Sequence, residues 1–373
     1  MQHKTWVEID LKQIEQNLLQ INSLLSEKTQ LMTVVKSNAY GHGLIEVAKV
    51  AKKSGAKWLG VDNLNEALAI KNTDIDLPVL ILGHIVEARL HEAAENDFSF
   101  VAYNKSTIDA LGGLDVPVKI HLKIETGTMR QGLFIKDLPD VLETIKKHQN
   151  IKLEGIYTHF ADIEDTTDHS FAMEQLSKFK QALEMVKKEG IEPLAHTACS
   201  AAIILYPETH FDLVRLGLSM YGYWPSPQTI VSAKNAEKSI ELFPALSWKT
   251  RIAQIKEIEA GTPIGYGQTE KAEASTRIAV IPVGYWDGYD RGLSGIGRVL
   301  IGGKRCKVVG RVCMNMCMVD VGHVEDLKID DEVVLIGKQG NEEITIEEMA
   351  QKLGTINYEI ISRINPLIPR IYM

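Results

Sequence analysis

The feature that most constrains the fold of this chain is an alternation of short apolar runs with helical stretches between residues 31 and 218. The apolar runs are short and rich in β-branched residues, which is typical of strands. Helical patterns separate most of them and often end at a glycine, such as Gly55 or Gly190. The runs lie at 31–35, 58–61, 78–82, 98–102, 116–124, 153–159, 194–198 and 213–218. Alternating strands and helices predict an α/β fold with a parallel sheet, and eight units favour a closed (β/α)8 barrel.

An open, doubly wound sheet is the alternative architecture, but no GxGxxG follows any predicted strand, which weakens a dinucleotide-binding interpretation. The alternation stops near Pro225, and from about residue 240 short β-like runs are separated by glycine-rich turns. We therefore predict a TIM-like (β/α)8 barrel over residues 10–235, followed by a mostly β C-terminal domain over residues 236–373. A strand predicted within residues 1–9 could join that second domain.

Composition excludes several classes of function. The 373 residues are 45% hydrophobic and 24% charged, which is typical of a soluble globular protein of two or three domains. A net charge of −8 argues against nonspecific nucleic-acid binding and against a polybasic membrane patch. No long apolar segment or export signal appears, so we expect a cytoplasmic protein with reduced cysteines. Cys313 and Cys317 have no nearby partners that complete a zinc site, and no bound metal is expected.

Polar residues follow several of the predicted strands, at the end of the barrel where such folds carry their chemistry. Lys36 follows the first run and either extends to solvent or becomes a neutral nucleophile. His159 could be a core histidine, Arg215 a surface ion pair and Ser200 a helix N-cap. Their common placement favours a shared site. Ser200 and the backbone near Gly217 would bind an anion, and an amine facing them suits pyridoxal phosphate.

Nine motifs in the chain resemble those of the alanine racemase family, a group of enzymes that depend on pyridoxal 5'-phosphate and have fold type III. They are VVKSNAYGHG, KIETGTMRQG, YTHF, HTACSAA, VRLGLSMYG, IGYGQTE, PVGYWDGY, GRVCMNMCMVDV and GTINYEI. The resemblance extends from about Thr5 to the C-terminus. It implies an isomerase that interconverts L-alanine and D-alanine by a two-base mechanism, supplies D-alanine for peptidoglycan, and forms a homodimer whose subunits share the active site.

The resemblance also implies roles for individual residues. Lys36 would bind the cofactor covalently and act as one base, and Tyr266 of the partner subunit would act as the other. Arg215 would face the pyridine nitrogen, and His159 would lie between Tyr266 and Arg215. The residues implied to bind the phosphate are Tyr40, Ser200, Gly217, Leu218 and Tyr358. Tyrosine at position 358, where serine-preferring relatives carry asparagine, favours alanine over serine as the substrate.

The remaining implied roles concern the substrate. Arg130 would bind the cofactor's ring oxygen and the substrate carboxylate. Met314 of the partner subunit would offer a backbone N–H, and Tyr285 would line the substrate pocket across the dimer. Lys123 matches a lysine that is carbamylated in some members. Asn315 stands where some members have aspartate, so no carboxylate role is expected there. The alternatives are a broad-specificity or serine-accepting racemase, a non-catalytic barrel that binds pyridoxal phosphate, and an amino-acid decarboxylase.

Overall fold

The computed structural model describes residues 2–373, which fall into two compact units. One unit holds residues 12–39 and 44–244. The other holds residues 40–43 and 245–373, together with the N-terminal strand β1 (Thr5–Ile9). Across residues 2–373, no helix combines the length and the hydrophobicity that a membrane span requires.

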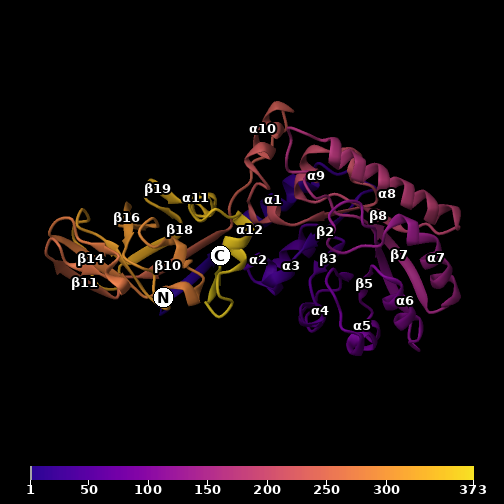
Figure 1. Ribbon diagram of the computed structural model, residues 1–373, viewed down its shortest axis with the longest axis horizontal. Coiled ribbons are helices and arrows are strands. Elements are labelled where there is room, and N and C mark those ends of the chain that lie inside the picture. Colours follow the sequence, from indigo (N-terminus) through magenta and orange to yellow (C-terminus); the bar gives the residue numbers. More distant parts are fainter. Residues whose placement is uncertain (1) are drawn as a thin grey trace. The chain divides into compact units, whose positions relative to one another are not determined.

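Eight parallel strands form the sheet of the first unit (Figure 1). They are β2 (Gln30–Val34), β3 (Trp58–Val61), β4 (Val79–Ile81), β5 (Ser99–Ala102), β6 (Val118–Lys123), β7 (Ile151–Tyr157), β8 (Leu194–His196) and β9 (Leu213–Leu216). Each strand from β2 to β7 pairs with the next one along the chain, and β9 pairs with β2. The Asp212 N–H donates to the Ala195 carbonyl at 3.1 Å and Arg215 N–H to the Ala198 carbonyl at 2.9 Å, which connects β9 to β8. The prediction of a (β/α)8 barrel is confirmed.

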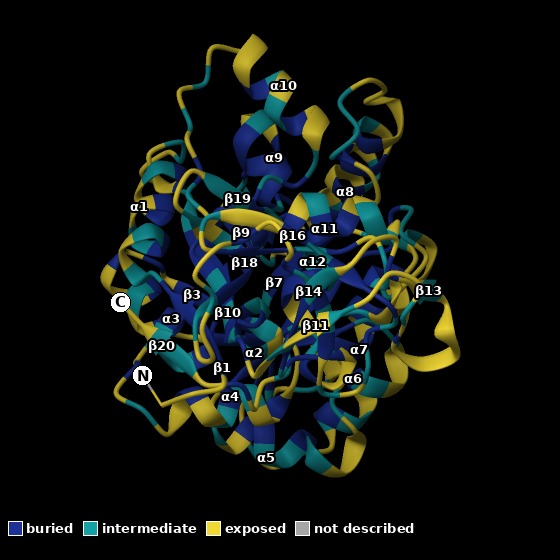
Figure 2. Cartoon of the chain, turned by 90° about the vertical axis from the view of Figure 1, so that its left-hand side faces the viewer, coloured by how far each residue is buried: buried dark blue, intermediate teal, exposed yellow. Residues whose placement is uncertain are grey.

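The barrel strands are buried along nearly their whole length (Figure 2), as expected for parallel strands covered on both faces. Side chains from six strands pack together in one buried cluster, which is the layered filling expected inside a barrel. Its members are Met32, Trp58, Leu80, Val101, Tyr157 and Leu213.

Helices precede, connect and follow these strands. They are α1 (Leu11–Asn22), α3 (Leu44–Lys53), α4 (Leu64–Lys71), α5 (Leu90–Glu95), α6 (Lys105–Gly112), α7 (Leu138–Lys147), α8 (Ser170–Lys188), α9 (Ser200–Leu205) and α10 (Pro227–Asn235), with short 3-10 turns η1 (Glu87–Arg89), η2 (Ile135–Asp137), η3 (Pro207–Thr209) and η4 (Leu218–Tyr221). Helix α8 buries Leu176, Phe179 and Leu183, which recur every three or four residues and so share one face.

The second unit is mostly β, as predicted, and its sheet is mostly antiparallel. Its strands are β1, β10 (Leu246–Arg251), β11 (Gln254–Ile258), β14 (Thr276–Ile281), β15 (Arg298–Ile301), β16 (Lys304–Val309), β17 (Cys317–Asp320), β18 (Glu332–Gln339), β19 (Glu342–Ile344) and β20 (Arg370–Tyr372), beside a small hairpin of β12 (Pro263–Ile264) and β13 (Glu270–Lys271). Strand β1 pairs antiparallel with β10 and parallel with β20, so both ends of the chain enter this sheet.

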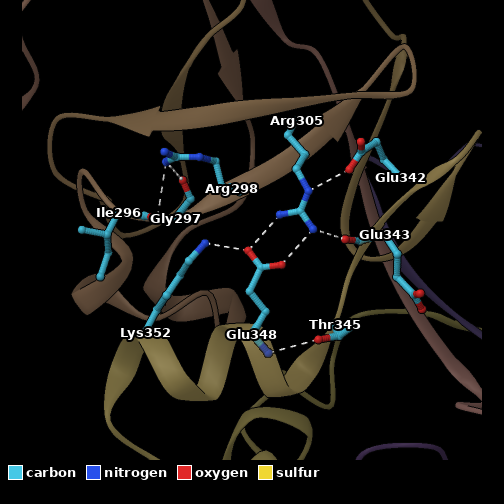
Figure 3. A network of polar contacts seen from close by, with 9 residues as sticks. All are labelled: Ile296, Gly297, Arg298, Arg305, Glu342, Glu343, Thr345, Glu348 and Lys352. Carbon is cyan, nitrogen blue, oxygen red and sulfur yellow. Dashed lines mark hydrogen bonds and ion pairs between the residues drawn. The ribbon is translucent and has the colours of Figure 1, made fainter.

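Short helices complete the second unit. They are η5 (Tyr266–Gln268), η6 (Tyr285–Asp287), η7 (Arg291–Leu293), α11 (Ile346–Leu353) and α12 (Asn357–Ser362). Arg305 on β16 binds Glu342 on β19 at 2.8 Å and Glu348 on α11 at 2.9 Å, and Lys352 binds the same Glu348 at 2.6 Å (Figure 3). This network connects α11 to β16 and β19.

Candidate active site

A turn of left-handed helix follows Lys36, which the sequence had not led us to expect. The four residues 37–40, none of them glycine, have φ between 52° and 56° within α2 (Lys36–Tyr40). Each such residue costs roughly 1–2 kcal/mol, so the surrounding structure must hold the turn. Glu66 accepts the Asn38 N–H at 3.0 Å, and Asn38 Oδ1 accepts the Leu44 N–H at 2.9 Å. Lys36 is therefore held at the end of β2 by a rigid turn.

Arg215 is a buried cation surrounded by neutral acceptors. Its Nη1 lies 2.7 Å from His196 Nδ1, and its Nη2 donates to the carbonyls of Thr158 at 2.8 Å and Thr197 at 3.0 Å. His159 Nδ1 lies 3.3 Å from Nη2. Among residues 2–373 no carboxylate lies within 4.0 Å of this guanidinium, so the surface ion-pair interpretation of Arg215 is wrong.

His159 stays neutral beside this cation. Desolvation, followed by the charges of Arg215 and Arg130, lowers its pKa well below the ordinary value. A neutral imidazole can accept a hydrogen bond from Arg215, as the 3.3 Å contact requires.

Lys123 is the second buried cation of the barrel unit, with only 5% of its surface exposed. Its Nζ lies 3.3 Å from Gln131 Oε1. Burial, then the charges of Arg130 and Arg215, lowers its pKa to about 8. An appreciable fraction of its amine is therefore neutral and nucleophilic near neutral pH.

Ser200 does not act as a helix cap. The N-cap of α9 is Cys199, which makes no capping hydrogen bond. The Ser200 hydroxyl instead accepts N–H groups from Gly217 at 3.2 Å and Ser219 at 3.4 Å. Two backbone N–H groups therefore converge on the Ser200 oxygen beside Leu218, and the hydroxyl hydrogen is left to donate to an anionic group.

Two buried side chains that the sequence analysis missed hold the loop that carries Arg130. Glu125 accepts the N–H groups of Gly127 at 2.7 Å and Arg130 at 3.3 Å. Gln175, fully buried on α8, donates to Thr126 Oγ1 at 3.1 Å. Gln175 lies on the apolar face of helix α8, where a polar side chain is unusual. This polar residue in an apolar pattern could have indicated a buried hydrogen-bonding role.

The other predicted site residues gather in the second unit. Tyr266, Tyr285, Met314 and Asn315 line one open pocket of about 470 Å³ together with Arg311. The rings of Tyr40 and Tyr358 lie with their centroids 6.2 Å apart. Tyr266 is 73% exposed, so its phenol is open to solvent in the single chain.

Comparison with known proteins identifies the family. A model of the alanine racemase N-terminal domain matches residues 9–225, and one of the alanine racemase C-terminal domain matches residues 245–372. The chain belongs to the alanine racemase family. The alanine racemase of Methanococcus maripaludis is 39% identical to it over 377 residues, which cover 100% of this chain and 99% of that protein.

Solved structures agree with this membership of the alanine racemase family. The crystal structure of alanine racemase from Bacillus anthracis with bound L-Ala-P matches with a TM-score of 0.93 at 36% identity, covering 100% of this chain and 96% of that one. A histidine racemase from Leuconostoc mesenteroides is more distant, with 26% identity, a TM-score of 0.89, and coverage of 100% and 98%. The family resemblance read from the motifs is therefore confirmed, and the chain is a racemase of the isomerase class.

Proposed function

We propose that this protein interconverts L-alanine and D-alanine with pyridoxal 5'-phosphate as cofactor, and so supplies D-alanine for peptidoglycan. The observation that supports this most strongly is Arg215, a buried guanidinium with neutral acceptors around it and no carboxylate within 4.0 Å among residues 2–373. A decarboxylase would instead place an acidic partner at the pyridine nitrogen. The match of the second unit to the C-terminal domain of the family also argues against a non-catalytic barrel.

The residues present fit this cofactor. Ser200, Gly217 and Leu218 would bind its phosphate, and Tyr40 and Tyr358 would be further phosphate ligands; the convergence of Gly217 N–H on the Ser200 hydroxyl and the 6.2 Å between the two tyrosine rings support this. Lys36 would attach it, and Arg215, which can only donate, would keep its ring nitrogen unprotonated. When bound, pyridoxal phosphate withdraws electrons from the α-carbon and weakens the bond to its hydrogen.

Inversion at one carbon needs a proton acceptor on each face, because one base removes the proton and another returns it from the opposite side. Lys36 Nζ and Tyr266 Oη would serve as these bases, with Tyr266 supplied by the second copy of the chain in a homodimer. Neutral His159 would help hold the tyrosine. Arg130 would bind the substrate carboxylate.

Two further residues would complete the substrate pocket from the second unit. Met314 would offer its backbone N–H to the carboxylate, and Tyr285 would line the wall; both border the same pocket as Tyr266. We also propose that Lys123 is carbamylated and supports Arg130, since a buried lysine with a pKa of about 8 provides the neutral amine that CO2 requires.

The function is tested with purified protein and added pyridoxal phosphate, by measuring racemisation of alanine, serine, lysine and arginine side by side. We expect alanine to be the preferred substrate and Lys36→Ala to abolish activity. A preference for another amino acid would support the broad-specificity racemase instead.

The second base is tested with Tyr266→Phe, which keeps the ring and removes the phenol. We expect racemisation to fall by roughly 10²–10⁴-fold, while exchange of the α-proton with deuterated water persists for one enantiomer. Unchanged racemisation in this variant would refute the two-base assignment.

A further inference from the structure

Behind Arg215 a line of polar side chains crosses the barrel interior from β9 to β7. Arg215 Nη1 lies 2.7 Å from His196 Nδ1 on β8. His196 Nε2 lies 2.9 Å from His121 Nδ1 on β6. His121 Nε2 lies 3.5 Å from Glu154 Oε2 on β7. Both histidines are fully buried.

Only one arrangement of protons satisfies this line. A guanidinium has no acceptor, so His196 Nδ1 must accept from Arg215 and its Nε2 must carry hydrogen. That hydrogen is donated to His121 Nδ1, which leaves the His121 hydrogen on Nε2, facing the Glu154 carboxylate. The last contact is longer than an ordinary hydrogen bond and acts as an electrostatic contact between N–H and carboxylate. All donors therefore point from the arginine toward Glu154.

The surroundings keep this line in place. A Cβ on Gly155 would lie 2.2 Å from His121 Nδ1, so a glycine is needed to make room for the imidazole. Burial lowers the pKa of both histidines, which keeps them neutral. Burial would by itself raise the pKa of Glu154, but the contacts with His121 and Ser99 outweigh it and the value falls to about 2. Glu154 is therefore an anion at neutral pH.

We propose that His196, His121 and Glu154 are positioning residues that orient the Arg215 guanidinium and balance its charge from inside the barrel. A buried cation without a counter-ion is costly, and aligned N–H dipoles that end at a carboxylate offset part of that cost. Fixing the tautomer of a histidine through a carboxylate is an established way of tuning a site. The expected effect on catalysis rests on the proposed function of Arg215. The hydrogen-bond directions follow from the contacts themselves and are independent of that function.

The variant Glu154→Gln tests the charge, because glutamine keeps the size and an acceptor oxygen for His121 and Ser99. We expect kcat to fall about tenfold with little change in KM, since the arginine would act on the cofactor ring and not on the substrate. The matched control is Lys152→Gln, which removes a 68% exposed lysine 3.5 Å from the same carboxylate and should leave kcat unchanged.

Nitrogen-15 spectra of the histidines provide a readout independent of activity. In the wild-type holoenzyme near pH 7 we expect both rings to be neutral and to carry hydrogen on Nε2. A doubly protonated ring, or hydrogen on either Nδ1, would overturn the proposal, and this holds even where Glu154→Gln fails to fold. A folded Glu154→Gln enzyme with the kcat of the Lys152→Gln control would overturn it as well. Wild-type protein with the expected spectra but no racemisation would refute the proposed function and leave the hydrogen-bond directions standing.

Discussion

Arg215 and Lys123 are two buried cations in one barrel, and the cost of burying their charges is reduced in different ways. The guanidinium of Arg215 keeps its charge and is surrounded by carbonyl oxygens and neutral imidazoles. The ammonium of Lys123 has one amide partner, and its pKa falls to about 8. Arginine cannot lose its proton in a protein, whereas lysine readily does so when buried. The first residue is suited to hold a fixed positive charge and the second to react as an amine.

The lowered pKa of Lys123 predicts a pH-dependent carbamate. About a tenth of an amine with this pKa is neutral at pH 7, far more than for an exposed lysine. The neutral nitrogen attacks CO2, an N–C bond forms and one N–H proton is released. At a fixed concentration of dissolved CO2, we expect occupancy to rise as the pH approaches and passes 8. Carbon-13 NMR with labelled CO2 measures it.

Two variants provide the controls for this signal. Lys123→Met should abolish the carbamate resonance, and Lys152→Met, at an exposed lysine, should retain it. A spectrum that keeps the resonance in Lys123→Met, or a wild-type protein without one, would contradict the carbamylation of Lys123.

At the scale of single elements, the left-handed turn after Lys36 predicts that replacing serine by glycine stabilises the protein in this turn and destabilises it in a right-handed helix. Ser37 is exposed and has a φ of 56°, a region that glycine adopts without steric cost. We expect Ser37→Gly to raise the free energy of unfolding by roughly 0.5–1 kcal/mol. Ser177, exposed in the middle of the right-handed helix α8, should respond to the same change with a loss of similar size. Chemical denaturation measures both, and a loss at position 37 would contradict the strain argument.

The network in Figure 3 is a second element-scale feature. Glu348 binds Arg305 at 2.9 Å and Lys352 at 2.6 Å, and so connects α11 to β16. We expect Glu348→Gln to lower the free energy of unfolding by about 1 kcal/mol at low salt, because a network is worth more than an isolated surface pair. The difference should shrink at high ionic strength. Glu174→Gln, which breaks an isolated pair with Lys178 within α8, is the control and should cost less.

For the whole molecule, the exposed aromatic and apolar residues of the second unit favour the proposed homodimer. Tyr266, Trp286 and Met314 are 73%, 60% and 55% exposed. Exposed apolar side chains grouped near a pocket are typical of a surface that is covered in an assembly. A phenol that serves as a base also needs shelter from water, which a second copy of the chain would supply.

A mixed dimer tests whether the site is shared. Lys36→Ala and Tyr266→Phe are each expected to be inactive alone. A mixed dimer would contain one site with both native bases and one site with neither, so refolding the two variants together should restore about one quarter of wild-type activity. Sedimentation verifies that mixed dimers form. Absence of activity in verified mixed dimers would contradict a site built from two subunits.

Much of this protein could be predicted from local sequence. The apolar runs located the barrel strands because parallel strands are buried on both faces, and glycine-rich turns marked the second unit. The motifs identified the family. Local sequence could not predict the left-handed turn, since Ser37 and Ala39 have no intrinsic preference for it and Glu66 on another helix holds it. It also could not predict the line of buried histidines behind Arg215, because His121 and His196 lie 75 residues apart.

The sequence alone determined which residues are available for chemistry and in what order they follow the strands: Lys36 after the first, Arg215 within the last, and Tyr266 in the second unit. These features depend on periodicity and motifs, which are properties of neighbouring residues. Only the tertiary structure decided the charge states of Lys123 and His159 and the direction of the hydrogen bonds behind Arg215. Those properties depend on burial and on neighbours from distant strands, which exist only once the barrel has closed.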